Sequence, residues 1–85
     1  MSSLLNILEQ LIAGAQSLGL PDTDLDNAIG YLENDEQWLC FDTIITQLYE
    51  NEIQFNEEYY LLIVRAASAM KLPPQEYEFM KQLIQ

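Results

Sequence analysis

Carboxylates are the most abundant side chains of this sequence that could take part in binding or chemistry. The 85 residues include 14 Asp or Glu, three Lys or Arg and no His, for a formal net charge of −11. Eleven acidic residues and no basic residue lie between Asp22 and Glu58. The resulting negative potential attracts basic partners and repels nucleic acid and anionic lipid. The composition therefore predicts a positively charged partner, and binding to neither nucleic acid nor a membrane.

Catalytic groups are few in this chain. Without histidine there is no histidine base, and the single Cys40 lies in an apolar stretch, where a thiol is expected to be an inert packing residue. One cysteine can form neither an intrachain disulfide nor an ordinary structural zinc site. Paired carboxylates could support glycoside hydrolysis, but a domain this small leaves little room for a substrate cleft. We expect no catalytic residue, no enzyme activity and no cofactor.

The aspartates that follow Pro21 allow a calcium-binding alternative. Asp22, Asp24 and Asp26 have the spacing of the first three ligands of a calcium loop, with Glu33 at its last position. The loop's glycine is missing, however, because Asn27 holds that place. The neighbouring apolar residues have helical spacing, which favours an acid-rich first helical turn and no metal site.

The spacing of apolar residues predicts an all-α fold of about five short helices and no strand pair. The first helix is expected from about Ser3 to Leu18, with Gly19 as its C-terminal cap. The second starts near Asp22 or Thr23, either of which could cap it, and the third spans about Glu36 to Glu50. Asn56 can cap a fourth helix and Pro74 fits the first turn of a last one.

The whole chain, residues 1–85, is expected to form one compact domain in which neighbouring helices are mostly antiparallel, because the connections are short. The fourth helix is apolar on most sides, so we expect it to be central. Trp38 and Tyr49 fall on the apolar stripe of the third helix and Ile29 on that of the second, so all three are expected in the core. Phe55 is expected to anchor the loop before the fourth helix inward. No uncharged apolar run approaches the ~20 residues that span a bilayer, and the start lacks a signal-peptide pattern, which favours a cytoplasmic protein.

The acids at the second and third helices form the candidate partner-binding site. Asp22, Asp24, Asp26, Glu57 and Glu58 have a structural explanation in capping and the helix dipole. Four further acids crowd the corner between these helices beside Tyr31: Glu33, Asp35, Glu36 and Asp42. Tyr31 itself could anchor a partner or be an ordinary surface tyrosine. The expected partner-binding residues are Asp24, Tyr31, Glu33, Asp35, Glu36 and Asp42. Exposed Leu39, Leu61 or Val64 could also support a homodimer.

From about Leu18 to Ile84 the chain resembles the MafI-type immunity proteins. The resemblance is a pattern of acids and apolar residues carried by 28–36, 39–44, 48–50, 53–55, 58–59, Met70, Leu72, 77–80 and 83–84. In that family a tryptophan is expected directly after the glutamate that matches Glu36, whereas here Gln37 precedes Trp38.

The resemblance implies an immunity protein of a polymorphic-toxin or contact-dependent growth-inhibition system. Such a protein binds the toxin domain in the bacterial cytoplasm and blocks it, and many of these toxins are nucleases with basic clefts. The expected partner is thus a cognate basic toxin domain. The alternatives are an acidic adaptor or nucleic-acid mimic without a toxin partner, and the calcium-binding module.

Overall fold

The first helix, α1 (Leu4–Leu18), begins and ends where the sequence predicts. In the computed structural model, which describes residues 3–85, the Ser3 side chain accepts a hydrogen bond from the Asn6 N–H at 3.2 Å. Gly19 ends the helix in the left-handed region at φ 98°, where glycine lacks the Cβ that would be strained.

The second helix, α2 (Asp22–Glu33), starts without a side-chain cap. The prediction that Asp22 or Thr23 caps it is wrong, because Pro21 occupies the cap position and its carbonyl accepts from the Asp24 and Leu25 N–H groups. Asp22 and Thr23 are therefore already helical. The acid-rich first turn is confirmed, with Asp22 and Asp24 close to the positive end of the helix dipole.

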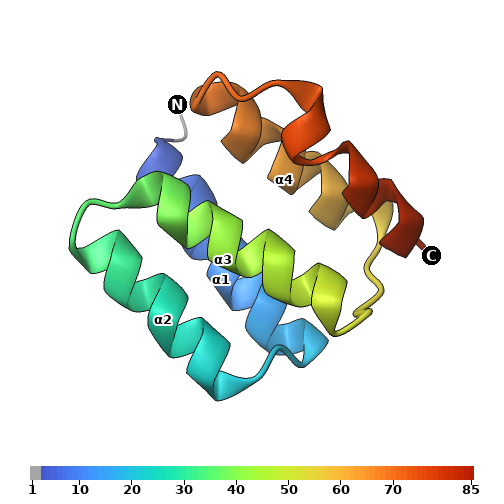
Figure 1. Ribbon diagram of the computed structural model, residues 1–85, viewed down its shortest axis with the longest axis horizontal. Coiled ribbons are helices and arrows are strands. Elements are labelled where there is room, and N and C mark those ends of the chain that lie inside the picture. The colour runs from blue at the N-terminus through green and yellow to red at the C-terminus, as the bar shows by residue number, and fades with distance from the viewer. Residues whose placement is uncertain (1–2) are drawn as a thin grey trace.

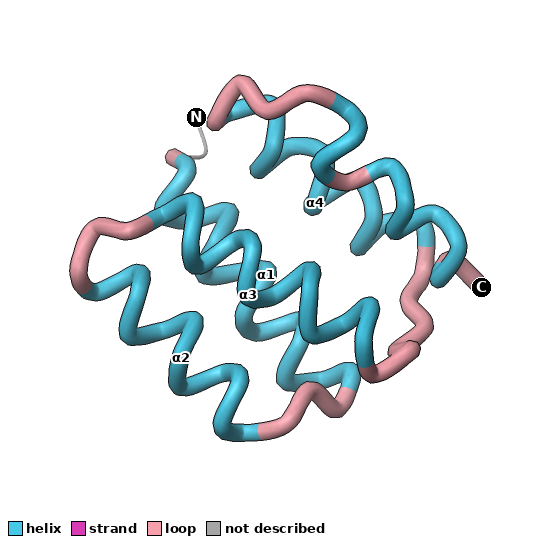
Figure 2. Tube along the Cα trace, viewed as in Figure 1, coloured by secondary structure: helices cyan, strands magenta, loops and turns pink. Residues whose placement is uncertain are grey.

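The third and fourth helices follow the expected boundaries closely. They are α3 (Gln37–Glu50) and α4 (Glu57–Ala69). The Asn56 side chain accepts from the Tyr59 N–H at 2.9 Å, so the predicted cap of α4 is confirmed. Consecutive helices are antiparallel: α1 and α3 run in one direction, α2 and α4 in the other, and the loops between them are short (Figures 1 and 2).

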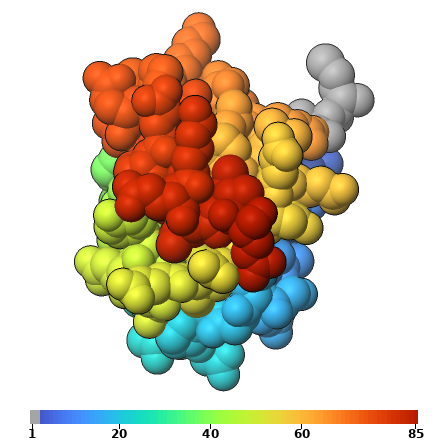
Figure 3. Space-filling view, turned by 90° about the vertical axis from the view of Figure 1, so that its right-hand side faces the viewer, coloured from blue at the N-terminus to red at the C-terminus, as the bar shows by residue number. Residues whose placement is uncertain are grey.

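The expected last helix is replaced by two 3-10 helices, η1 (Pro74–Glu76) and η2 (Glu78–Leu83). Tyr77 interrupts them with a φ of −142°, which an α-helix does not allow. The end of the chain is also held by backbone hydrogen bonds to Phe55, from the Phe55 N–H to the Leu83 carbonyl at 3.0 Å and from the Gln85 N–H to the Phe55 carbonyl at 2.9 Å. This C-terminal segment lies against α4 and the end of α3 (Figure 3).

The core is built around α1 and α3: α1 contacts α2, α3 and α4, and α3 contacts α1, α2 and η2. The prediction that α4 is the central helix is wrong, because α4 packs mainly on α1 and its Leu61 side chain is 51% exposed. α1 and α4 approach closely where the helices cross, because Gly14 has no side chain and the Tyr59 ring fills that space. The Tyr59 hydroxyl donates to the Leu11 carbonyl at 2.6 Å in the interior. The all-α bundle itself is confirmed.

Candidate functional site

The acidic residues are unevenly distributed over the fold. The segment from Leu4 to Glu50, which contains α1, α2 and α3, has nine Asp or Glu and no Lys or Arg. The three bases, Arg65, Lys71 and Lys81, lie on α4 and beyond it. Within residues 3–85 no charged side chain is buried, so this part of the bundle presents its acids to solvent.

Two of the predicted site residues form the turn between α2 and α3. The Asp35 N–H donates to the Leu32 carbonyl at 3.2 Å and the Glu36 N–H donates to the Tyr31 carbonyl at 2.9 Å, the paired bonds of a Schellman motif. Asp35 is held at a φ of 60°. Both carboxylates are exposed, and Glu36 is at the start of α3, where the helix dipole favours an anion.

The structure separates Tyr31 from Glu33. Residues two apart on a helix point in nearly opposite directions, and Glu33 lines a groove between α1 and α2 that Tyr31 does not reach. Tyr31 is half-buried and packs against the core. Asp24 precedes Tyr31 by two helical turns, so it lies on the same side of α2. Asp24 is half-buried as well. The six predicted residues thus do not form one cluster.

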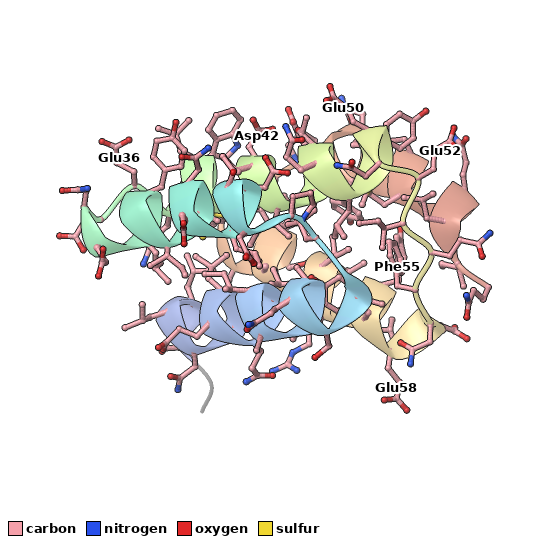
Figure 4. All side chains as sticks on the ribbon, turned by 90° about the horizontal axis from the view of Figure 1, so that it is seen from below. Glu36, Asp42, Glu50, Glu52, Phe55 and Glu58 are labelled. Carbon is pink, nitrogen blue, oxygen red and sulfur yellow. The ribbon has the colours of Figure 1, made fainter. Side chains whose placement is uncertain are left out.

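Asp42 lies on the outward side of α3. It is half-buried, and the Thr46 hydroxyl donates to its Oδ1 at 3.5 Å. Glu36, Asp42, Glu50 and Glu52 all point to one side of the molecule, along the whole length of α3 (Figure 4). The structure therefore extends the acidic corner into a longer acidic surface.

Two aromatic residues of this surface were not predicted from the sequence to lie there. Trp38 and Tyr49, expected in the core, are 45% and 41% exposed. Trp38, Asp42 and Thr46 follow each other at four-residue spacing and so share one side of the helix. The two polar residues on that side could have indicated that Trp38 points outward. The Tyr49 ring packs edge-on against Phe79 at 5.0 Å between centroids. We call Glu36, Trp38, Asp42, Tyr49 and Glu50 the α3 face.

Some of these acids occupy positions that helix electrostatics disfavour. Glu33 is the last residue of α2, Glu50 is the last residue of α3, and Glu52 follows closely. A negative charge at the negative end of the helix dipole is destabilising, typically by about 0.3–1 kcal/mol. Neither α2 nor α3 has a basic residue in its last turn. Helix formation therefore does not explain these carboxylates.

The one thiol is not available for chemistry near neutral pH. Cys40 is fully buried on α3. Burial raises the pKa of the Cys40 thiol from 9.0 to about 11, so the thiolate is scarcely populated at pH 7. The expected packing position of Cys40 is confirmed.

The aspartates of the calcium alternative are not arranged as a loop. Residues 22–33 form α2, and Asp22, Asp24 and Asp26 point successively to opposite sides of a helix at that spacing. Among the residues that the structure describes, no three Cys, Asp or Glu side chains come together as metal ligands would.

Within residues 3–85 no helix has both the length and the apolar character needed to cross a membrane. Compared with known proteins, the chain matches no family model, no curated protein and no solved structure.

Proposed function

We propose that this protein is an immunity protein that binds and neutralises a cognate basic toxin domain in the cytoplasm. The proposal is supported chiefly by one observation: the segment from Leu4 to Glu50 carries nine acids without a base, and Glu33 and Glu50 stand where they weaken their own helices. Residues that lower the stability of the free protein are expected where a partner requires them. A basic toxin surface would neutralise this charge on binding.

The anchor of the interface is better assigned to Trp38 than to Tyr31. Trp38 offers a large apolar surface to a partner, whereas Tyr31 is half-buried and already packs against the core. Tryptophan and tyrosine are enriched among the residues that contribute most to protein interfaces. On the α3 face, Asp42 lies between Trp38 and Tyr49 in sequence, so lysines or arginines of a toxin could pair with it beside an apolar contact.

The test is co-expression with the protein encoded by the gene immediately upstream, where the proposal places the toxin. We expect growth to be rescued and the two proteins to co-purify. The charge reversal Glu33→Lys with Glu36→Lys should weaken binding about tenfold or more, which corresponds to ~1.4 kcal/mol. Both side chains are exposed and neither makes a cap hydrogen bond, so the variant is expected to fold.

The matched control is Glu76→Lys with Glu78→Lys. These two residues are also exposed and lie on the C-terminal segment. Replacing both with lysine changes the net charge by the same amount as the Glu33→Lys and Glu36→Lys pair. Long-range attraction is thus reduced equally in both variants, and only local contacts differ. Equal affinities of the two variants in calorimetric titration would refute the placement of the interface. Failure of rescue by the unmodified protein would refute the immunity function and leave an acidic adaptor or nucleic-acid mimic.

A further inference from the structure

A groove of about 410 Å³ runs between α1 and α2, on the side of α2 that faces away from Tyr31. Leu5 and Ile12 of α1 and Ile29 and Leu32 of α2 supply its apolar lining. Leu5 and Ile12 are seven residues apart, so the apolar floor extends over about two helical turns, ~10 Å. The two helices that form the groove lie side by side (Figure 4).

The groove leaves apolar side chains without a partner in this fold. Leu5 is 47% exposed and Ile29 is 40% exposed, two of the five large hydrophobic residues that remain exposed in the described chain. Helical spacing predicts that Ile29 is buried, but only Leu25 and Ala28 of α2 are fully covered. Contiguous exposed apolar surface bordered by polar groups is typical of interaction sites.

The charges that border the groove have one sign. Glu9 lines it from α1 and Glu33 from α2. Neither helix contains a lysine or arginine that could neutralise them. A ligand that fills the groove must therefore combine an apolar stripe with flanking positive charge.

We propose that the groove binds an amphipathic α-helix of a partner protein, with its apolar stripe on Leu5, Ile12, Ile29 and Leu32 and its lysines or arginines beside Glu9 and Glu33. Helix-in-groove binding uses apolar anchors at three- and four-residue spacing, which matches the spacing of the groove's own residues on α1. That the helix belongs to the toxin rests on the proposed function. That the groove prefers a basic helix rests only on its own residues and holds for any partner.

A second copy of the chain fits the groove poorly. A symmetric pair would bring the same patch of both copies together, so that Glu9 and Glu33 of one protomer would approach those of its partner. Like charges placed opposite each other at an interface are unfavourable, and each protomer carries a net charge of −11. Charge therefore selects a basic partner over self-association.

The direct test uses the full chain and a synthetic amphipathic helix as the probe. The probe has the length of α1, 15 residues, with leucines along one face and lysines beside them. Its control has glutamate in place of each lysine. Titration is followed by the amide resonances of the protein and by the fluorescence of Trp38, its single tryptophan, which lies on α3. We expect the lysine helix to bind, to shift resonances of Leu5, Ile12 and Ile29, and to leave Trp38 fluorescence unchanged.

The variant test places a positive charge in the groove. Ile29→Lys should weaken binding of the lysine helix about tenfold, ~1.4 kcal/mol, by removing an anchor and repelling the ligand. Leu61→Lys is the matched control, since Leu61 is similarly exposed but lies on α4, and its affinity should stay within about twofold of the unmodified chain. Because both side chains are exposed, both variants are expected to fold.

Several results would overturn the proposal. They are equal binding of the lysine and glutamate helices, shifts centred on α3 with altered Trp38 fluorescence, and equal affinities of the two variants. Self-association in sedimentation equilibrium that Ile29→Lys abolishes would assign the groove to a second copy instead. If the toxin is neutralised but Ile29→Lys binds it normally, the groove is wrong as its docking site and the immunity function stands. If the lysine helix binds the groove but no toxin is neutralised, the groove is a binding site for a basic helix and the immunity function is wrong.

Discussion

Gly14 shows how one residue determines the distance between two helices. A Cβ added there would lie 2.9 Å from Cδ1 of Tyr59 and nearer still to Cε1, so either the Tyr59 ring or the two helices would have to shift. The interior of a folded protein has little space to absorb such a clash.

Gly14→Ala is therefore expected to destabilise the fold. Overpacking costs about 1–3 kcal/mol, and the better helix propensity of alanine offsets about 1 kcal/mol, which leaves a net loss of about 1 kcal/mol. Gly30→Ala is the control, because a Cβ there meets nothing within 4 Å and should instead stabilise α2 by up to about 1 kcal/mol. Urea unfolding of both variants measures the difference. Equal changes in the free energy of unfolding would contradict the close approach.

Two buried ionisable groups, the Cys40 thiol and the Tyr59 hydroxyl, make the stability of the fold depend on pH. Burial raises the pKa of Cys40 to about 11 and raises the pKa of Tyr59 above its usual range. Both groups hold their protons more tightly in the folded state than in the unfolded state. Their contribution is fully present below about pH 9 and is lost as the pH rises through the folded-state values.

The free energy of unfolding should thus decline above about pH 9, with a slope of up to about 1.4 kcal/mol per pH unit for each proton. Tyr59→Phe should reduce this slope, because it removes the ionisable hydroxyl, and should also cost about 1 kcal/mol at pH 7 through loss of the hydrogen bond to the Leu11 carbonyl. Urea unfolding between pH 7 and 11 measures both effects. A slope identical in the unmodified chain and in Tyr59→Phe would argue against burial of this proton.

At the scale of the elements, all four α-helices within residues 3–85 end in the same way. Each is followed by a residue at positive φ: Gly19 after α1, then Asp35, Glu52 and Lys71. After α2 and α3 an asparagine precedes that residue, and its side chain donates to the carbonyl four residues back, Asn34 to Gly30 at 2.8 Å and Asn51 to Gln47 at 2.7 Å. Three of the four ends therefore use a side chain where glycine would fit without strain.

Glu52→Gly should stabilise the protein. It relieves the left-handed strain, about 1 kcal/mol, and removes a carboxylate from the negative end of the α3 dipole. Glu52→Ala is the control that removes the charge but keeps the Cβ, so the difference between the two variants isolates the backbone effect. Thermal unfolding should show a gain of about 4–8 °C per kcal/mol for a domain of this size. A glycine variant no more stable than the alanine variant would contradict the strain at this position.

At the scale of the whole molecule, like charge opposes folding. A net charge of −11 on a bundle whose longest extent is 31 Å places many carboxylates within one screening length of each other at low salt. A basic partner and added salt should relieve the same repulsion.

Raising NaCl from about 10 mM to 1 M, which shortens the screening length from ~30 Å to ~3 Å, should therefore raise the Tm by several degrees. Glu76→Lys with Glu78→Lys lowers the net negative charge and should show a smaller salt dependence. Scanning calorimetry over the salt series measures both. A Tm independent of salt would show that charge repulsion is not a significant part of the free energy of folding.

The sequence by itself determined the properties that depend on neighbours along the chain. The cap at Asn56, the left-handed end at Gly19, the acid-rich start of α2 and the buried positions of Cys40 and Phe55 all follow from local residue types and helical spacing. The same is true of the exposed acids, because a charged side chain remains in solvent unless it is paired.

Only the tertiary structure decided which apolar faces are covered. Helical spacing identifies a stripe but not the number of helices that pack on it, so Trp38, Tyr49 and Ile29 were expected inside and are exposed. The central positions of α1 and α3, the separation of Glu33 from Tyr31 and the groove between α1 and α2 have the same origin. Each depends on how helices distant in sequence approach one another, and the spacing within a single helix contains no information about that approach.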